Sequence, residues 1–337
     1  DAPYHAGRGD AWRKIKQRDA EEFAVVGFTA PKGRRAGLGA LLLAAPDGAR
    51  GWRYAGRVGT GMSDALLDSL ARQLAKGARV IDYSGDFRFN NAEDYADYAR
   101  RIGRDPVHKT PELLPQTVYG LPELNRKAYG KNQRLVGNPG CFAVSCLVGL
   151  APAAAAKLVD FKSVICDCKT GVSGAGKKAT PIHHYPARYE NMQAYRLSGH
   201  QHVMEVERML GGLAGEPVPV TFTAQVVPVC RGILSCLYGT LRDGIGLAQV
   251  REAYAEFHKG NPFVRLFDSK AVVGTAHVRG SNFCNLTVDV DERTRRLRVV
   301  SHIDNLMKGQ AGSALQNMNL IFGLPENLGL DHPGAYP

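Results

Sequence analysis

Apolar and polar positions along the chain change their period near residue 66. Upstream of that point, three short apolar runs, at residues 22–29, 38–45 and 52–58, are each bounded by glycine, proline or charged residues. Such runs are typical of a small antiparallel β unit. Downstream, the leucines of residues 64–76 recur at helical spacing, and Gly77 stands where a helix would end. The two parts of the chain therefore predict different architectures.

After this helix, short apolar runs alternate with helical patterns. Residues 79–83 and 134–137 predict buried strands, and residues 142–158 predict a helix with Pro152 in its path. This alternation favours βαβ units and a parallel sheet. From residue 162 onward strands dominate, including a hairpin that turns at residues 292–295, and a final helix is predicted over residues 307–322.

Composition narrows the class of protein. The chain is 44% apolar and 22% charged, which is typical of a folded globular protein. It has no apolar run near the roughly 18 residues that a membrane-spanning helix needs, and no signal peptide, so we expect a cytoplasmic protein without a membrane partner. The seven cysteines are odd in number, all follow residue 140 and include no CxxC pair. This usage favours free thiols in a reducing compartment over disulfides or a zinc ribbon.

The formal net charge of +11 is unevenly distributed. Residues 1–60 hold eleven lysines and arginines against six aspartates and glutamates, so nearly half of the excess lies in less than a fifth of the chain. These cations, beside Trp12 and Trp52, would suit phosphate contact and base stacking. A nucleic-acid-binding module at this end is one hypothesis, although an incomplete β unit with exposed edges argues against it.

Cys141 is the strongest candidate for a catalytic residue. It follows a predicted strand and the turn Asn138-Pro139-Gly140, and a predicted helix comes next. Unsatisfied N–H groups and the helix dipole favour a thiolate at such a place, which is typical of a nucleophilic cysteine. The alternative is a small buried thiol, which we favour for the other six cysteines, including Cys166 and Cys168 on one face of a predicted strand.

A cysteine nucleophile needs a proton partner, and one cluster could supply it. His200 and His202 are separated by one residue and followed by Glu205. Imidazole is the side chain best suited to exchange protons near neutral pH. An HxH pair also fits a zinc ligand pair or two surface residues, and the residues by themselves leave these alternatives open.

Two further features suit anionic or flat ligands. Residues 171–178 read GVSGAGKK and follow a predicted strand, so their backbone N–H groups could approach a phosphate or a ring closely. The Walker spacing is absent, which excludes an ATPase, and a plain turn is the alternative. Arg88, Arg231 and Arg279 stand in motif-like surroundings, and arginine binds phosphate and carboxylate well, although a single arginine more often forms a salt bridge.

From about residue 76 to the C-terminus, the motifs taken in order resemble those of the N-acetyl-gamma-glutamyl-phosphate reductases, NADPH-dependent enzymes of arginine biosynthesis. The related aspartate-semialdehyde dehydrogenases and acetyl-aminoadipyl phosphate reductases match these strings less well. The motifs are IDYSGDFRF (81–89), HKTPELL (108–114), VYGLPELNR (118–126), GNPGCF (137–142), KTGVSGAGKK (169–178), SGHQH (198–202), VPVCRGIL (227–234), RGSNFC (279–284) and IDNLMKGQAGSALQNMNLIFGL (303–324).

The resemblance implies a reaction and a set of site residues. Cys141 would attack an acyl phosphate, expel phosphate and carry the acyl group as a thioester, which hydride from NADPH would convert to a semialdehyde. His200 would act as the acid and base. The resemblance also implies NADP(H) as cofactor, no metal, a small-molecule acyl phosphate as substrate and a homo-oligomer. The implied contacts are Arg88 with the phosphate, Asn138, Tyr195 and Arg231 with the substrate, and Ser173, Gly174, Gly176, Gln316 and Asn317 with the cofactor.

The first 66 residues depart from that family, whose members begin with a strand and a GxTGYxG turn that binds the dinucleotide pyrophosphate. No such turn is found here. Residues 1–66 instead resemble the end of the adenylation domain and the start of the OB domain of a bacterial end-joining ATP-dependent DNA ligase. WRKIK at residues 12–16 matches that family's last nucleotidyl-transfer motif. The nucleophilic lysine motif KxDG is absent, so ligation is excluded.

These patterns and resemblances predict an α/β plus α+β chain in four parts. We expect an acyl-phosphate reductase whose activity is impaired by the loss of the glycine turn. The alternatives are a ligase-derived nucleic-acid-binding module and a non-functional chimera. The parts are a partial OB-like β head at 1–66, an incomplete Rossmann-type layer at 67–140, a larger mixed-sheet catalytic and oligomerisation domain at 141–307, and a C-terminal helix at 308–337 that returns to the cofactor layer.

Overall fold

The computed structural model describes residues 79–334, apart from residues 109, 131 and 177–179, together with the backbone of three earlier strands. These strands are β1 (Ala24–Thr29), β2 (Ala40–Pro46) and β3 (Trp52–Val58), and they confirm the three upstream runs predicted from the sequence. The helix predicted over residues 64–76 and the WRKIK motif lie outside the described residues. So do most of the cations on which the nucleic-acid hypothesis rests.

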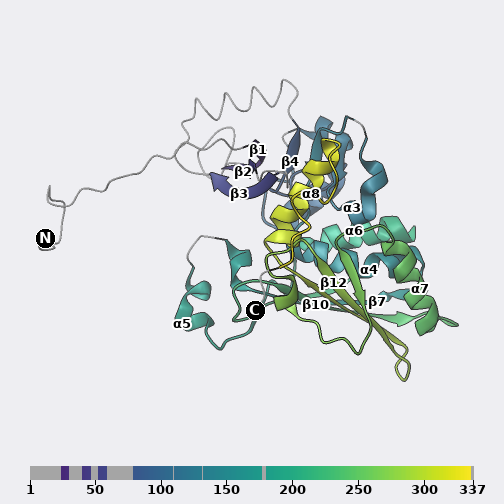
Figure 1. Ribbon diagram of the computed structural model, residues 1–337. Helices are drawn as coiled ribbons and strands as arrows, with labels where there is room; N and C mark the ends of the chain where they lie inside the picture. The colour runs from purple at the N-terminus through teal and green to yellow at the C-terminus, as the bar shows by residue number, and fades with distance from the viewer. Residues whose placement is uncertain are drawn as a thin grey trace, which may run out of the picture.

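The first sheet has six strands in the order β3-β2-β1-β4-β6-β5. Its parallel part consists of β4 (Val80–Asp82), β6 (Leu135–Gly137) and β5 (Thr117–Tyr119). β1 joins β4 in parallel, and β2 and β3 follow as an antiparallel meander (Figure 1). The upstream strands thus form an open row that extends the parallel layer. The predicted partial OB-like head is not confirmed, because β1 pairs with β4 and so links these strands to the parallel layer.

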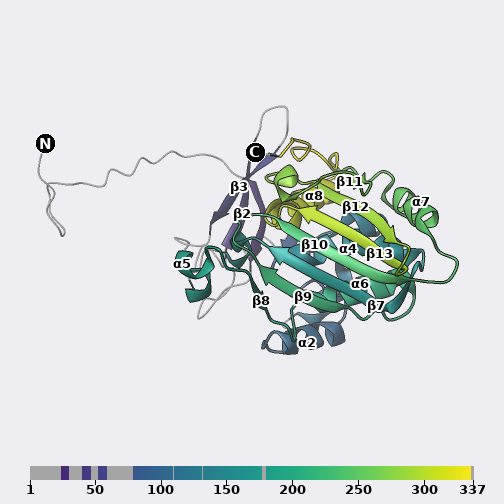
Figure 2. The ribbon, with the colours of Figure 1, turned by 90° about the horizontal axis from the view of Figure 1, so that it is seen from below.

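The second sheet has seven strands in the order β11-β12-β13-β10-β7-β9-β8, with mixed parallel and antiparallel pairing. β12 and β13 form the hairpin that the sequence predicted around residues 292–295. Figure 2 shows these strands side by side, with α4 and α6 behind them. The bounds are β7 (Val159–Thr170), β8 (Gln193–Tyr195), β9 (Thr221–Val226), β10 (Ile233–Leu241), β11 (Val264–Phe267), β12 (Cys284–Asp291) and β13 (Arg296–Ile303).

Helix α4 (Cys141–Ala155) is the centre of the fold. Its residues from Phe142 to Ala154 are all buried, because apolar and small side chains occupy its whole circumference. It packs against the second sheet on one side and against α6 (His202–Ala214) and α7 (Leu247–His258) on others. The sequence predicted that this helix ends at residue 158. It ends three residues earlier, at Ala155, because Lys157 adopts the left-handed conformation.

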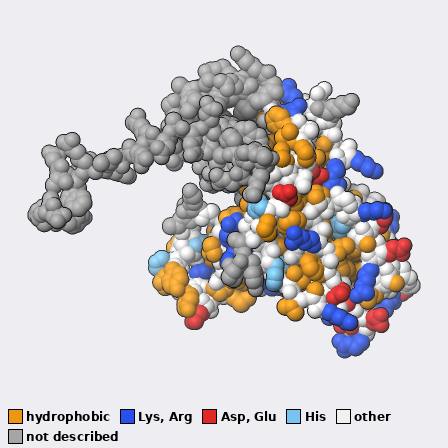
Figure 3. Space-filling model, in the orientation of Figure 1, with side chains coloured by type: hydrophobic (Ala, Val, Ile, Leu, Met, Phe, Trp, Pro, Cys, Tyr) orange, Lys and Arg blue, Asp and Glu red, His pale blue; other side chains and the backbone are white. Residues whose placement is uncertain are grey.

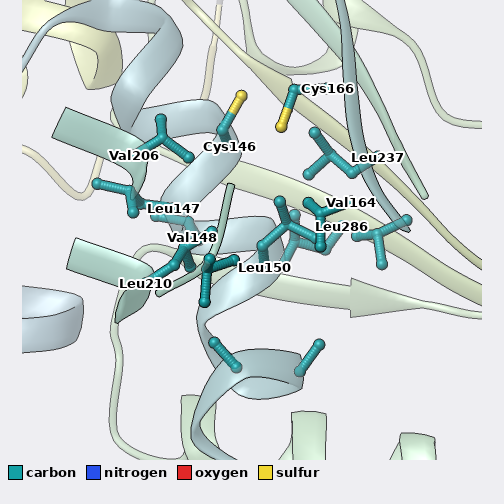
Figure 4. Packing of buried hydrophobic residues seen from close by; sticks show 14 of the residues in the cluster. Cys146, Leu147, Val148, Leu150, Val164, Cys166, Val206, Leu210, Leu237 and Leu286 are labelled. Atoms are coloured by element: carbon teal, nitrogen blue, oxygen red, sulfur yellow. The ribbon is translucent and has the colours of Figure 1, made fainter. Parts of the chain in front are cut away.

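The core around α4 gives the start of this helix a rigid support. Figure 4 shows Leu147 and Val148 of α4 near Val206 and Leu210 of α6, and all four belong to one buried cluster. Burying an apolar side chain of this size stabilises a fold by about 1.5–3 kcal/mol. Cysteines 146, 166 and 168 are also fully buried there, with the sulfurs of residues 146 and 168 at 3.5 Å, so they are core residues as expected.

The chain returns from the second sheet to the first through the π-helical turn η7 (Met307–Ala311) and helix α8 (Gly312–Ile321). α8 packs against β1 and β4. Among the described residues, none of the helices combines the length and apolar character needed to cross a membrane. The remaining short elements are α2 (Ala92–Arg101), η2 (Pro111–Gln116), α3 (Pro122–Asn125), η3 (Arg126–Ala128), η4 (Val172–Ala175), η5 (Pro181–His183), α5 (Tyr185–Arg188) and η6 (Thr275–Val278).

Candidate active site

The turn before Cys141 lies where the parallel strands of the first sheet end. β6 ends at Gly137 and α4 begins at Cys141, which confirms the strand, turn and helix predicted around this residue. The chain packs tightly here, since a Cβ on Gly140 would lie 2.0 Å from Nε2 of His202. The carboxyl ends of parallel strands are where open α/β sheets bind ligands. Cys141 therefore stands at a place suited to a bound substrate.

Two buried charged residues contact this turn. Nε of Arg88 donates a hydrogen bond to the carbonyl oxygen of Asn138 at 2.8 Å, and NH1 of Arg88 pairs with Oε1 of Glu205 at 2.8 Å. Oε2 of Glu205 accepts the N–H of Gly140 at 3.1 Å and the hydroxyl of Tyr119 at 3.0 Å. The structure thus places Arg88 and Asn138, two residues expected near the substrate, in one hydrogen-bonded network beside Cys141.

The electrostatic surroundings of Cys141 oppose ionisation. Burial raises the pKa of the Cys141 thiol to about 11, while the N–H of Phe142 and the charge of Arg88 lower that pKa and the charge of Glu205 raises it. The N–H groups at the helix start lower this pKa in the predicted direction, but the effect of burial is larger. A helix N-terminus acts through a few N–H groups, whereas the neighbours that exclude water act on the whole side chain.

His200 lies in the loop before α6 and packs against Phe142, the residue after Cys141. Its ring centroid is 5.6 Å from that of Phe142 and 5.7 Å from that of Tyr195. Tyr195 is close to Cys141. Burial raises the pKa of Tyr195, and the negative charge of a Cys141 thiolate raises it further. Burial lowers the pKa of His200 to about 3, so the imidazole is neutral near neutral pH. Its Nδ1 accepts the backbone N–H of His202 at 3.2 Å.

His202 is the first residue of α6 and is buried. Burial and then the charge of Arg88 lower its pKa well below the ordinary value. Its Nε2 lies 4.0 Å from Oε1 of Glu205, and its Nδ1 has no hydrogen-bond partner among the described residues. As for the zinc alternative, the described part of the chain holds no group of three or more His, Cys, Asp or Glu side chains placed to bind a metal ion.

A second cluster of predicted residues gathers at the end of β13. NH2 of Arg231 pairs with Asp304 at 3.0 Å, and the fully buried Asp304 also accepts the N–H groups of Leu306 and Met307. The neighbouring Asn305 bonds the hydroxyl of Ser173 at 3.0 Å. This cluster leads into η7, where a Cβ on Gly309 would lie 2.8 Å from Cβ of Cys141. Arg231 and the glycine loop thus connect to the nucleophile through η7.

Gln316 and Asn317, which the resemblance implies at the cofactor, are both buried on α8. Asn317 joins the site, because its Nδ2 donates to Oδ1 of Asn138 at 3.1 Å. Gln316 lies in a separate network, where its Oε1 accepts from Nζ of Lys308 at 2.7 Å and its Nε2 donates to Oε1 of Glu123 at 3.0 Å. Nζ of Lys308 also pairs with that Glu123 oxygen at 2.5 Å, and both side chains are fully buried.

Two residues of the hydrogen-bonded network around Cys141, Tyr119 and Glu205, were not predicted as site residues from the sequence. Tyr119 was not singled out, and Glu205 was noted only as a neighbour of the histidine pair. The sequence held a signal for Glu205, because His202 and Glu205 are three residues apart and therefore lie on one face of α6. It held no local signal for Asp304, whose role comes from contacts with Arg231 and Gly280 far away in the sequence.

We expect acid to destabilise this fold through its buried neutral histidines. Burial lowers the pKa of His258 to about 4, and its ring bonds the carbonyl oxygen of Val148 at 3.0 Å. The unfolded chain takes up this proton near pH 6.5, so the stabilising effect is complete above about pH 6.5 and is lost as pH falls towards about 4. Urea unfolding at a series of pH values should show this slope, and His258→Gln should make it shallower.

The exposed His332 provides the matched control, because His332→Gln should leave the slope unchanged. An unaltered slope in His258→Gln would mean that the buried histidine does not govern the acid response.

Comparison with known proteins identifies the family of this chain. Residues 141–305 match the model for the semialdehyde dehydrogenase dimerisation domain. The N-acetyl-gamma-glutamyl-phosphate reductases of Geobacter metallireducens and Geobacter sulfurreducens are 44% and 46% identical over 274 residues, which cover 81% of this chain and 77% of each relative. The chain belongs to the N-acetyl-gamma-glutamyl-phosphate reductase family. The reductase of Symbiobacterium thermophilum is 44% identical over 82% of this chain and 78% of its own length.

Solved structures support the fold of this reductase family member. Aspartate semialdehyde dehydrogenase II from Vibrio cholerae superposes with a TM-score of 0.55 at 20% identity, covering 76% of this chain and 77% of that one. A probable aspartate-semialdehyde dehydrogenase from Pseudomonas aeruginosa gives 0.53 at 18% identity, covering 76% of this chain and 75% of that one. The protein is therefore an oxidoreductase with a mixed α/β fold of the semialdehyde dehydrogenase type.

A second family matches the beginning of this reductase. Residues 34–96 match the model for the C-terminal region of ATP-dependent DNA ligases. The match spans β2 and β3 and extends over β4, which carries the first reductase-like motif. It agrees with the ligase resemblance of the first 66 residues.

Proposed function

We propose that this chain reduces N-acetyl-gamma-glutamyl phosphate to N-acetylglutamate semialdehyde with NADPH, through a thioester on Cys141. The observation that carries the proposal is the position of Cys141 at the start of a buried helix, with Tyr195 close to it and His200 packed against Phe142 and Tyr195. A partly buried thiol close to neutral imidazoles suits acyl transfer, because a nearby sulfur can form a covalent acyl intermediate. The names of the relatives supply the substrate.

In the first step the sulfur of Cys141 attacks the acyl carbon. The bond from that carbon to the phosphate oxygen breaks, and phosphate departs with the electron pair and with the proton of the thiol. A thioester remains on Cys141. This route needs no preformed thiolate, which agrees with the raised pKa of the thiol.

When bound, the nicotinamide supplies a hydride to the thioester carbon, and the carbonyl oxygen becomes negative. We propose that His200 stabilises this oxygen. Its Nδ1 accepts a backbone N–H, so the ring proton lies on Nε2, which can donate a hydrogen bond. The carbon–sulfur bond then breaks, the carbonyl reforms as the semialdehyde, and the sulfur, which leaves with the electron pair of that bond, takes up a proton from solvent. The resemblance implied that His200 acts as acid and base. We propose instead that it only donates a hydrogen bond to the oxygen.

Membership of this family implies a nicotinamide cofactor, and we propose NADP(H). The residues after β7 fit its nicotinamide end, since a Cβ on Gly176 would meet none of the described residues within 4 Å and the Ser173 hydroxyl is held by Asn305. We therefore assign Ser173, Gly174 and Gly176 to it. For the pyrophosphate end, the described residues offer no match, and the next described strand after β1 is the antiparallel β2.

Arg231 is the best-placed residue for a carboxylate of the substrate. Its NH2 pairs with Asp304, while its buried Nε has no hydrogen-bond partner among the described residues. An unpaired buried donor is unfavourable, so an incoming carboxylate oxygen would satisfy it. Tyr195 and Asn138 border the same nucleophile. Gln316 and Asn317 support the site indirectly. Gln316 accepts a hydrogen bond from Lys308, and Asn317 donates one to Asn138.

The function is tested in the reverse direction with purified protein. We expect phosphate-dependent reduction of NADP⁺ with N-acetylglutamate semialdehyde, at a kcat/KM at least about 100-fold above that with aspartate semialdehyde. N-acetyl-aminoadipate semialdehyde is the third substrate to compare. A preference for either competitor, or no turnover with any of the three, would overturn the proposal.

His200→Ala should separate acyl transfer from reduction. We expect kcat for NADPH oxidation to fall by about 10²–10³, because the oxygen loses its hydrogen-bond donor. A single-turnover burst of phosphate release should persist, since thioester formation does not need His200. Rapid-quench measurement of both products checks this, with His332→Ala as the exposed control. A burst lost in proportion to kcat would place His200 in the first step instead.

We also propose a homo-oligomer. The lobe around α5 exposes the large side chains of Tyr185, Tyr189 and Met192, and Figure 3 shows apolar side chains gathered on it. Exposed apolar surface of this kind is typical of contacts between proteins. A second copy of the chain is the natural partner, because the matched family model over residues 141–305 is named a dimerisation domain.

A further inference from the structure

We propose that Arg88 and Glu205 form a charge-paired clamp that fixes the turn presenting Cys141 and sets the electrostatic balance at its sulfur. Both act as positioning residues, and neither binds the substrate. The inference rests on the proposed function only for the role of Cys141. It replaces the expectation that Arg88 meets the phosphate of the substrate.

Arg88 and Glu205 each form a hydrogen bond with the backbone of the turn before Cys141. Arg88 donates to the carbonyl oxygen of Asn138, and Glu205 accepts the N–H of Gly140, so the peptide groups on either side of Pro139 are held. The two side chains come from the loop after β4 and from α6, and their own ion pair at 2.8 Å ties these elements together. The turn is therefore fixed by charge-assisted hydrogen bonds, which are stronger than neutral ones.

The guanidinium nitrogens of Arg88 already have hydrogen-bond partners within the protein. Its side chain is only 6% exposed, and its three nitrogens donate to Asn138, to Glu205 and to the carbonyl oxygen of Tyr83. Binding a phosphate would require it to leave Glu205, whose side chain is fully buried, without a cation. An unpaired buried carboxylate is strongly unfavourable. The geometry therefore favours a structural use of this arginine.

The same pair acts on the sulfur with opposite signs. The positive charge of Arg88 favours the thiolate of Cys141, and the negative charge of Glu205 disfavours it. Tyr195 faces the sulfur as a neutral phenol, and the neutral His202 packs against Gly140. The neutral His200 packs against Phe142, and η7 brings the uncharged Gly309 next to Cβ of Cys141. Among the described residues, Arg88 and Glu205 are therefore the charged groups that shift the pKa of the Cys141 thiol.

The test is the pH dependence of alkylation at Cys141. Iodoacetamide modification is followed by mass spectrometry of the peptide that contains Cys141, which separates it from the other six thiols. We expect Glu205→Gln to lower the midpoint pH by about one unit and Arg88→Gln to raise it by at least as much, which is about tenfold in ionisation constant each way. A role confined to holding the fold would shift both variants in the same direction.

The double variant Arg88→Gln/Glu205→Gln guards against unfolding, because it leaves no unpaired buried charge and keeps groups that can donate and accept. Its midpoint should return to within about half a unit of the original protein. The exposed pair Arg295–Asp243, at 2.6 Å, gives the control, and Asp243→Asn should not move the midpoint. Shifts of the same sign in the two single variants, or none in either, would overturn the clamp.

Kinetics distinguish the clamp from a phosphate site. In Arg88→Gln we expect kcat to fall at least about tenfold while KM for the acyl phosphate changes less than about threefold. A large rise in KM with an unchanged alkylation profile would assign Arg88 to the substrate instead. The alkylation assay needs no substrate, so its result does not depend on which acyl phosphate the enzyme reduces.

Discussion

Replacing Cys141 with serine is expected to lower acyl-phosphate reduction by at least about 10⁴-fold, the scale on which the loss of a nucleophile acts. The serine hydroxyl has nearly the size of the thiol but is a far weaker nucleophile, and His200, whose Nδ1 accepts a backbone N–H, carries its proton on Nε2 and cannot take a second one there while neutral. Because residue 141 begins a helix that is otherwise buried, the substitution should leave the fold intact. Steady-state NADPH oxidation and the circular dichroism spectrum measure the two effects.

Cys236→Ser is the matched control for this substitution. Cys236 is a partly exposed free thiol on β10 and contacts none of the proposed site residues, so its loss should leave kcat within about twofold. Trapping of an acylated enzyme by acid quench and mass spectrometry should place the label on the peptide of Cys141. Turnover of Cys141→Ser above about 1% of the original rate would remove the thioester from the proposal.

Lys308→Met should reduce the free energy of unfolding by about 3–5 kcal/mol, because it strips a buried carboxylate of its cation. Burial raises the pKa of Glu123, but the charge of Lys308 and the hydrogen bond from Gln316 more than offset this, so the pKa of Glu123 is lowered overall. Without the ammonium, the carboxylate must take up a proton or draw in water. Urea unfolding near neutral pH measures the loss.

Two variants sharpen this prediction. Lys308→Met/Glu123→Leu removes both charges, so it should recover a large part of the stability that Lys308→Met loses. Lys259→Met breaks only the exposed pair with Glu256 and should leave the unfolding midpoint unchanged. If the double variant were no more stable than Lys308→Met, the loss would come from packing around η7 rather than from an unpaired charge.

Several elements could be predicted from the sequence because their signals are local. The strands at residues 24–29 and 52–58, the β12–β13 hairpin and the start of α4 after a Pro-Gly turn each depend on residues within one or two turns of chain. The helix start lowers the pKa of the Cys141 thiol as its sequence position indicates, but burial raises this pKa by more, because burial depends on neighbours that are distant in the sequence.

The sequence by itself determined the candidate nucleophile, its helix start, the histidine beside it and the family motifs, since each is a short pattern of residue types. Only the tertiary structure showed that Arg88 and Glu205, 117 residues apart, meet at 2.8 Å around the turn before Cys141. Only it showed that the upstream strands continue the parallel layer through β1 and β4. The physical reason is the same in both cases. Buried charges and strand edges find partners according to how whole elements pack, and that packing is not encoded in any short stretch of the chain.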